Sequence, residues 1–192
     1  MQSDLTAMTA AQCKQRLKEL IISKALSFGD FTLASGRKSS YYIDCRPVTL
    51  DGEGAYLLAR CLLELLKEED IEAVGGMAIG ADPISAATSA IAASMGRKLD
   101  AFIVRKQPKD HGTGRQVEGP LCQGARVAMV EDTVTTGGST LTAIAAVQRE
   151  RNAEVVMILV MVDRQEGARE AFEEAGYRFV SLFTVEELGV KV

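Results

Sequence analysis

The segment from Val127 to Thr140 is the feature that most constrains the fold. Four apolar residues at 127–130 precede two adjacent acids, Glu131 and Asp132, and a loop of hydroxyls and glycines follows. We expect a buried strand that stops at Glu131, because ligands of open α/β sheets bind at the carboxyl ends of strands. Backbone N–H groups and a helix N-terminus after such a strand suit a phosphate. The segment therefore predicts a site for a phosphorylated sugar. The alternative is an ordinary strand–turn–helix, although two acids at a buried strand end are costly without a ligand.

Strand patterns alternate with helical patterns along the rest of the chain, which predicts an α/β fold with a mostly parallel central sheet flanked by helices. An early β-rich piece would form a small flap over that sheet. We expect one domain over 1–192, with this N-terminal part at about 1–50 and the core at about 51–192. The expected strands are 28–33, 40–44, 73–74, 101–104, 127–130, 155–162 and 177–184, and the expected helices are 9–24, 53–69, 82–96 (with Asp82 as N-cap), one through 141–145, and 167–174.

Composition excludes several classes of protein. The 192 residues carry a formal net charge of −4, which argues against a surface that binds nucleic acid. No apolar run is long enough to span a bilayer, and no signal peptide is evident. The four cysteines are scattered and His111 is the single histidine, which argues against a zinc site. Reduced thiols in a cytoplasmic protein are the expectation.

The segment 105–123 does not follow the alternation of strand and helix patterns, which predicts a long mobile loop. A loop of that length in a compact domain is usually functional or disordered. It concentrates cations in an acidic protein: Arg105, Lys106, Lys109 and Arg115, with His111 beside them. A solvated basic loop is the alternative, since most charge runs are solvated. A phosphate site elsewhere in the chain favours a role in binding an anion.

Four segments carry a resemblance to known enzymes. The stretch 127–140 resembles the phosphoribosyl-diphosphate (PRPP) signature of the type I phosphoribosyltransferases. The motif Arg105-Lys106-x-x-Lys109-x-His111-Gly112 resembles the catalytic loop of the orotate phosphoribosyltransferase family, and segments 31–39 and 163–167 are similar to two further motifs of that family. The resemblance implies the type I phosphoribosyltransferase fold, with a small N-terminal β-rich hood and a long mobile catalytic loop. It also implies transfer of the phosphoribosyl group from PRPP to orotate.

The same resemblance implies roles for individual residues. Lys109, Asp132 and His111 would be catalytic, and Thr135 and Arg164 would bind orotate. Mg²⁺ would be held mainly by PRPP and water, with no direct protein ligand. A homodimer that shares the catalytic loop across its interface is expected, with no nucleic-acid or membrane partner. The residues expected to bind PRPP are Arg105, Lys106, Lys109, His111, Glu131, Asp132, Thr133, Val134, Thr135, Thr136, Gly137, Gly138 and Ser139.

Two positions depart from the family pattern, because Ala34 and Gly80 stand where many members carry lysine. Each departure removes a cation that the family places near PRPP, so those two contacts do not carry over to this chain. Two alternative functions stay open: a purine or uracil phosphoribosyltransferase, and a PRPP-sensing regulator that binds nucleic acid. Simpler interpretations also exist for single residues. Arg164 could pair with Asp163 or Glu166 on the surface, Tyr41 could be only a sheet residue, and no feature of the sequence around Cys45 indicates an activated thiolate.

Overall fold

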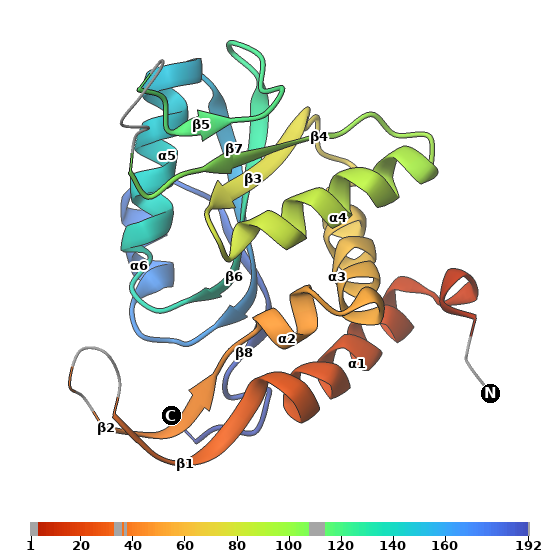
Figure 1. Ribbon diagram of the computed structural model, residues 1–192, viewed down its shortest axis with the longest axis vertical. Coiled ribbons are helices and arrows are strands. Elements are labelled where there is room, and N and C mark those ends of the chain that lie inside the picture. Colours follow the sequence, from red (N-terminus) through yellow and green to blue (C-terminus); the bar gives the residue numbers. More distant parts are fainter. Residues whose placement is uncertain (1–3, 33–35, 37, 108–113, 192) are drawn as a thin grey trace.

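The structure, a computed structural model, describes residues 4–32, 36, 38–107 and 114–191. It contains an antiparallel hairpin and a six-stranded sheet of order β5-β4-β3-β6-β7-β8 (Figure 1). Among the described strands of the six-stranded sheet, only β5 runs antiparallel to its neighbour, which confirms the expected mostly parallel central sheet. The strands are β1 (Leu26–Thr32), β2 (Lys38–Ile43), β3 (Ala73–Met77), β4 (Asp100–Val104), β5 (Val117–Glu118), β6 (Arg126–Val134), β7 (Glu154–Asp163) and β8 (Phe179–Thr184).

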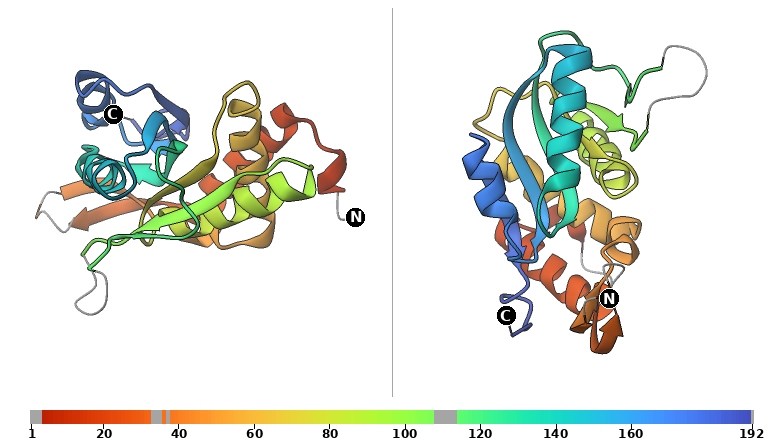
Figure 2. Two further views of the ribbon diagram at one scale, coloured as in Figure 1. Left: turned by 90° about the horizontal axis from the view of Figure 1, so that it is seen from above. Right: turned by 90° about the vertical axis from the view of Figure 1, so that its left-hand side faces the viewer.

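Helices cover both faces of the sheet. Figures 1 and 2 show α5 and α6 on one side and α3 and α4 on the other. In the described part of the chain, no helix is both long and apolar enough to cross a membrane. The helices are α1 (Ala10–Leu20), α2 (Arg46–Thr49), α3 (Gly52–Leu65), α4 (Ala81–Ser94), α5 (Gly138–Arg151) and α6 (Ala168–Glu174), with a 3-10 turn η1 (Leu5–Ala7) and a π-helical turn η2 (Ile21–Ala25).

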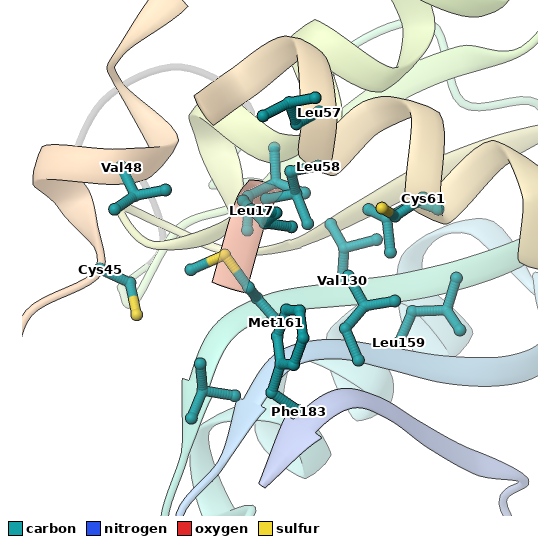
Figure 3. Packing of buried hydrophobic residues seen from close by; sticks show 14 of the residues in the cluster. Leu17, Cys45, Val48, Leu57, Leu58, Cys61, Val130, Leu159, Met161 and Phe183 are labelled. Atoms are coloured by element: carbon teal, nitrogen blue, oxygen red, sulfur yellow. The ribbon is translucent and has the colours of Figure 1, made fainter. Parts of the chain in front are cut away.

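Alternate residues of the central strands enter two separate cores. Ala128 and Val130 of β6 pack on the side of α1, α3 and α4, whereas Val127 and Met129 pack on the side of α5 and α6. Figure 3 shows the first core, where side chains of α1 and α3 meet Val130 and residues of β7 and β8. Because both faces are covered, the strands are almost continuously apolar, as is usual in parallel sheets. This packing fixes the ends of β6 and β7, on which the site is built.

Local signals in the sequence explain several helix ends. Thr9 and Gln12 form the expected capping box at the start of α1, with Gln12 N donating to Thr9 Oγ1 at 3.3 Å and Thr9 N donating to Gln12 Oε1 at 2.9 Å. Asp51 caps α3 by accepting from Gly54 N at 3.0 Å. Gly96 follows α4 with φ +77°, a conformation that glycine adopts at low cost.

Three expectations about the elements are wrong. Strand β6 does not stop at Glu131 but runs to Val134, because its pairing with β7 continues to Val134↔Asp163. Asp82 is not the N-cap of α4, since the helix begins at Ala81 after Gly80 and Asp82 lies in its first turn. The segment 105–123 is not all loop, because the buried Val117 pairs with Val104 and forms β5. The short helix α2 was not expected.

Candidate active site

The site lies where β6 continues past the end of its pairing with β3. That pairing ends at Gly75↔Met129, whereas the pairing with β7 continues to Val134↔Asp163. On the edge of β6 that faces β3, Glu131 and Asp132 therefore border the turn between β3 and α4, while the other edge remains paired with β7. An added Cβ at Gly80 would lie 2.6 Å from Glu131 Oε1 and 2.8 Å from Asp132 Oδ1. The absence of a side chain at position 80 lets the backbone of this turn approach both carboxylates.

Burial perturbs both acids. It raises the pKa of Glu131 to about 8, and the charge of Asp132 adds to the increase, while Lys106 opposes it. Burial also raises the pKa of Asp132, although hydrogen bonds from Thr133 N (2.7 Å) and Thr133 Oγ1 (3.3 Å) to Oδ1 oppose the increase. Within the described ranges neither carboxylate forms an ion pair. A buried and a half-buried acid without an ion-pair partner suit a ligand rich in hydroxyl donors.

A loop and a helix N-terminus follow the acids directly. Gly137 has φ +78°, and an added Cβ there would lie 2.6 Å from the Phe172 ring, so only glycine fits without displacement of that ring. Helix α5 begins at Gly138 with no side-chain cap, and its first backbone bond runs from Leu141 N to Gly137 O at 3.0 Å. The N–H groups of the first turn thus have no partner within the helix. An anion can bind them and also gains from the helix dipole.

Arg164 lies beside this loop. Its backbone N donates to Val134 O at 3.0 Å, which places residue 164 next to Thr135. The side chain is 14% exposed and forms an ion pair with Glu166 at 3.0 Å, one of the two simpler pairings considered from the sequence. Its Nε also donates to the hydroxyl of Tyr41 at 3.1 Å. The structure thus places Thr135 and Arg164 next to each other and adds a contact between Arg164 and Tyr41.

The basic loop is described only at its two ends. Arg105 N donates to Gln116 O at 2.9 Å, and the Glu150 carboxylate on α5 accepts from Gln116 N and Val117 N at 3.1 Å. Lys106 is close enough to lower the pKa of Glu131. Lys109 and His111 lie outside the described residues, as does Ala34. The geometry therefore places the start of the loop near the acids.

The described part of the chain contains neither an activated thiolate at Cys45 nor a group of three or more protein side chains that could hold a metal ion. Cys45 is 1% exposed, and burial together with Asp132 and Asp44 raises its pKa well above the ordinary value for a thiol. Such a group is not an activated thiolate, in agreement with the interpretation of the sequence. No group of three or more His, Cys, Asp or Glu side chains among the described residues is arranged to hold a metal ion.

Sequence reasoning missed two features of the site. Tyr41 lies in a strand, as interpreted from the sequence, but its contact with Arg164 was not expected, because the two residues are 123 positions apart. The contact between Gly80 and the acids joins segments about 50 positions apart, and the sequence shows only a glycine after an apolar strand. The pairing of β3 with β6, which brings these segments together, is a property of the folded sheet.

Comparisons with known proteins give a consistent result. No family model matches the chain. An orotate phosphoribosyltransferase from Streptomyces avermitilis is 50% identical over 175 residues, which cover 91% of this chain and 96% of that protein. The solved orotate phosphoribosyltransferase of Mycobacterium tuberculosis H37Rv, in complex with Fe(III) dicitrate, matches with a TM-score of 0.82 and 43% identity over 93% of this chain and 99% of that one. The structure of the same enzyme in complex with PRPP matches with a TM-score of 0.79 and 39% identity. The similarity spans nearly the whole chain and not only the motif around Glu131.

Proposed function

Because the chain belongs to the orotate phosphoribosyltransferase family, we propose that the carboxyl ends of β6 and β7, with the loop that follows β6, form its active site. The protein transfers the 5-phosphoribosyl group from PRPP to orotate and forms orotidine 5'-monophosphate and diphosphate, a step of pyrimidine biosynthesis. One observation carries the assignment of the site. A buried and a half-buried carboxylate, Glu131 and Asp132, and the N-terminus of α5, free of a side-chain cap, lie on one continuous segment.

PRPP lies along this segment in the proposal. Glu131 and Asp132 accept hydrogen bonds from the ribose hydroxyls, which supplies donors to one buried and one half-buried acid that have no ion-pair partner among the described residues. The 5-phosphate binds the loop 133–139, where the N–H groups of the first turn of α5 have no side-chain cap and can donate to it. Gly80 supports this arrangement, because the turn before α4 can approach the sugar without a side chain between them.

Charge separation is the main demand of the reaction. The bond between C1 of the ribose and the diphosphate oxygen breaks with its electron pair on the diphosphate, a bond from C1 to N1 of orotate forms, and the proton of N1 passes to the departing diphosphate or to water. Positive charge develops on the ring, where Asp132 offsets it, and negative charge moves to the departing diphosphate. Four residues stabilise that diphosphate in the proposal: Arg105, Lys106, Lys109 and His111. Lys109 is the main catalytic cation and His111 is a candidate proton donor, and both assignments rest on the resemblance of the loop motif.

Orotate binds on the side of Arg164. A guanidinium matches a planar carboxylate in two-point geometry, which an ammonium group cannot do. Thr135 lies next to Arg164 because of the backbone bond between Arg164 N and Val134 O. The acceptor is then held between this pair and the ribose bound at Glu131 and Asp132.

Mg²⁺ suits the donor set of this pocket. The ion prefers oxygen ligands, retains several waters and commonly binds substrate phosphates. We propose that PRPP and water would hold the ion without a direct bond to the protein, and that the negative charge of Glu131 and Asp132 would favour a cation at the site. When bound, it supplies neutralisation of charge on the diphosphate.

The proposal extends to the setting of the enzyme. We propose one domain over 1–192 that acts as a homodimer, with the catalytic loop of one protomer reaching the site of its partner. A cytoplasmic location agrees with four free cysteines at positions 13, 45, 61 and 122. PRPP and orotate are the proposed small-molecule partners, with no nucleic acid or membrane.

Steady-state kinetics with PRPP, Mg²⁺ and different acceptors test the proposal. Orotate should be consumed only when PRPP is present, and uracil or purines should be poor acceptors. Asp132→Asn should lower kcat and raise KM for PRPP, whereas Asp70→Asn, a change at a side chain that is 90% exposed, should do neither. Parent-like kinetics of Asp132→Asn would show that the carboxylates do not bind the sugar.

A further inference from the structure

Two side chains from distant parts of the sequence hold the guanidinium of Arg164. Its Nε donates to the hydroxyl of Tyr41 at 3.1 Å, across 123 positions in the chain, and its Nη2 lies 3.0 Å from Glu166 Oε1. The guanidinium carbon is also 5.1 Å from the centre of the Tyr41 ring, within the range of a cation–π interaction. Since only 14% of the Arg164 side chain is exposed, solvent screens these contacts weakly.

These contacts select one edge of the guanidinium for a ligand. A carboxylate can approach arginine through Nε and Nη2 or through Nη1 and Nη2, in each case with two parallel hydrogen bonds. Tyr41 uses Nε, so the edge that carries Nη1 and Nη2 is the one open to two-point binding. Glu166 contacts Nη2, which has two hydrogens and can serve a second acceptor.

The hydroxyl of Tyr41 limits how the guanidinium can turn. Without it, the ion pair with Glu166 would be the remaining polar restraint described for the side chain, and the planar group could rotate toward that carboxylate. Arg164 has several rotatable bonds, whose freedom a bound ligand would then have to restrict. A guanidinium fixed in advance avoids that cost.

We infer that Tyr41 is a positioning residue for acceptor binding, which holds Arg164 so that its Nη1–Nη2 edge receives the carboxylate of orotate. This inference rests on the proposed function, in which Arg164 binds the acceptor. It gives the N-terminal hairpin a role in the reaction. Tyr41 lies on β2, and Figure 1 shows this hairpin at one end of the molecule, outside the six-stranded sheet.

Tyr42 offers a matched control on the same strand. Successive side chains of a strand point to opposite faces, and the Tyr42 ring packs against Phe31, with a centroid distance of 5.7 Å. Its side chain is more exposed, at 45% for the residue. Tyr42→Phe removes the same hydroxyl as Tyr41→Phe, from a neighbouring position without the contact to Arg164.

Steady-state kinetics of Tyr41→Phe test the inference. We expect KM for orotate to rise about tenfold while kcat and KM for PRPP stay within about twofold, as loss of a hydrogen bond to a charged group that acts in binding predicts. Tyr42→Phe should match the parent enzyme. Comparable increases in KM for both substrates would instead indicate a general structural role of Tyr41 and would overturn the inference.

A double-mutant cycle with Arg164→Ala separates the possible failures. If Tyr41 acts through Arg164, then Tyr41→Phe should change KM for orotate less than about twofold once the guanidinium is gone. A full tenfold effect in that background would refute the inference. A parent enzyme that forms no orotidine 5'-monophosphate would refute the proposed function itself. A normal KM for orotate in Arg164→Ala would refute the placement of the acceptor, and with it the inference.

Discussion

Substitution of Glu131 by glutamine should make the ligand-free protein more stable at neutral and alkaline pH. Burial raises the pKa of Glu131 from 4.5 to about 8, so the folded state retains a proton that the unfolded chain loses. Stability falls with rising pH wherever the folded state binds more protons than the unfolded state. Glu131 therefore destabilises the fold progressively between pH 4.5 and about 8, whereas glutamine carries no such penalty.

The size of the effect follows from the interval between the two pKa values. Each unit of difference in pKa is worth about 1.4 kcal/mol of stability. Glu131 therefore destabilises the fold by about 5 kcal/mol above pH 8, and by almost nothing near pH 4.5. Typical domains are stable by about 5–15 kcal/mol, so a penalty of this size is a large share of the total. At pH 7 the expected advantage of Glu131→Gln is about 3–4 kcal/mol, because most of the interval has been crossed.

Urea unfolding at pH 5.5, 7.0 and 8.5, at one protein concentration and without PRPP, measures this difference. The free energy of unfolding of Glu131→Gln relative to the parent should increase at each step. Glu174→Gln, a change at an exposed glutamate of α6, should show a small difference that does not vary with pH. A constant difference for Glu131→Gln across the three pH values would show that the carboxylate ionises normally, and the electrostatic description of the site would be wrong.

Two substitutions test other parts of the site. Gly80→Ala places a Cβ 2.6 Å from Glu131 Oε1. It should lower kcat/KM for PRPP on the order of a hundredfold, because displacement of positioned groups by about 1 Å has an effect of that size. Gly52→Ala is the control and should leave the kinetics unchanged, because a Cβ at position 52 meets no atom within 4 Å. Equal kinetics for both variants would contradict the close approach. Lys109→Ala should lower kcat on the order of a hundredfold, because it removes a cation that stabilises the transition state. The dissociation constant for PRPP, measured by calorimetry, should change little. An unaltered kcat would show that Lys109 is not a catalytic residue.

The sequence predicted what local patterns determine. Alternating strands and helices, the capping box of α1 and the segment after Val130 all depend on residues close together in the chain, and the structure contains each of them. The end of β6 was misplaced because its last residues pair with β7 but not with β3. An acid inside a strand gives the same local signal as an acid just after it.

Contacts between segments that are distant in the chain could not be predicted from the sequence. The hydrogen bond from Arg164 to Tyr41 depends on where the hairpin docks, and the approach of Gly80 to the acids depends on the order of strands. Neither contact can be inferred from the spacing of residues along the sequence. The pKa of Glu131 also could not be predicted, because the sequence shows two adjacent acids but not the burial that dominates the shift.

The same burial leads to a prediction about substrate binding. A group with a pKa of about 8 is about nine-tenths protonated at pH 7, so Glu131 of the free protein carries a proton. Ribose hydroxyls that donate to this carboxylate, and a divalent cation near it, both favour the ionised form and lower its pKa. Binding of PRPP with Mg²⁺ should then release most of one proton at pH 7 and much less at pH 9. Titration calorimetry in two buffers of different ionisation enthalpy measures this release, and Glu131→Gln should abolish it. Identical heats in the two buffers for the parent protein would mean that the sugar does not meet a protonated Glu131.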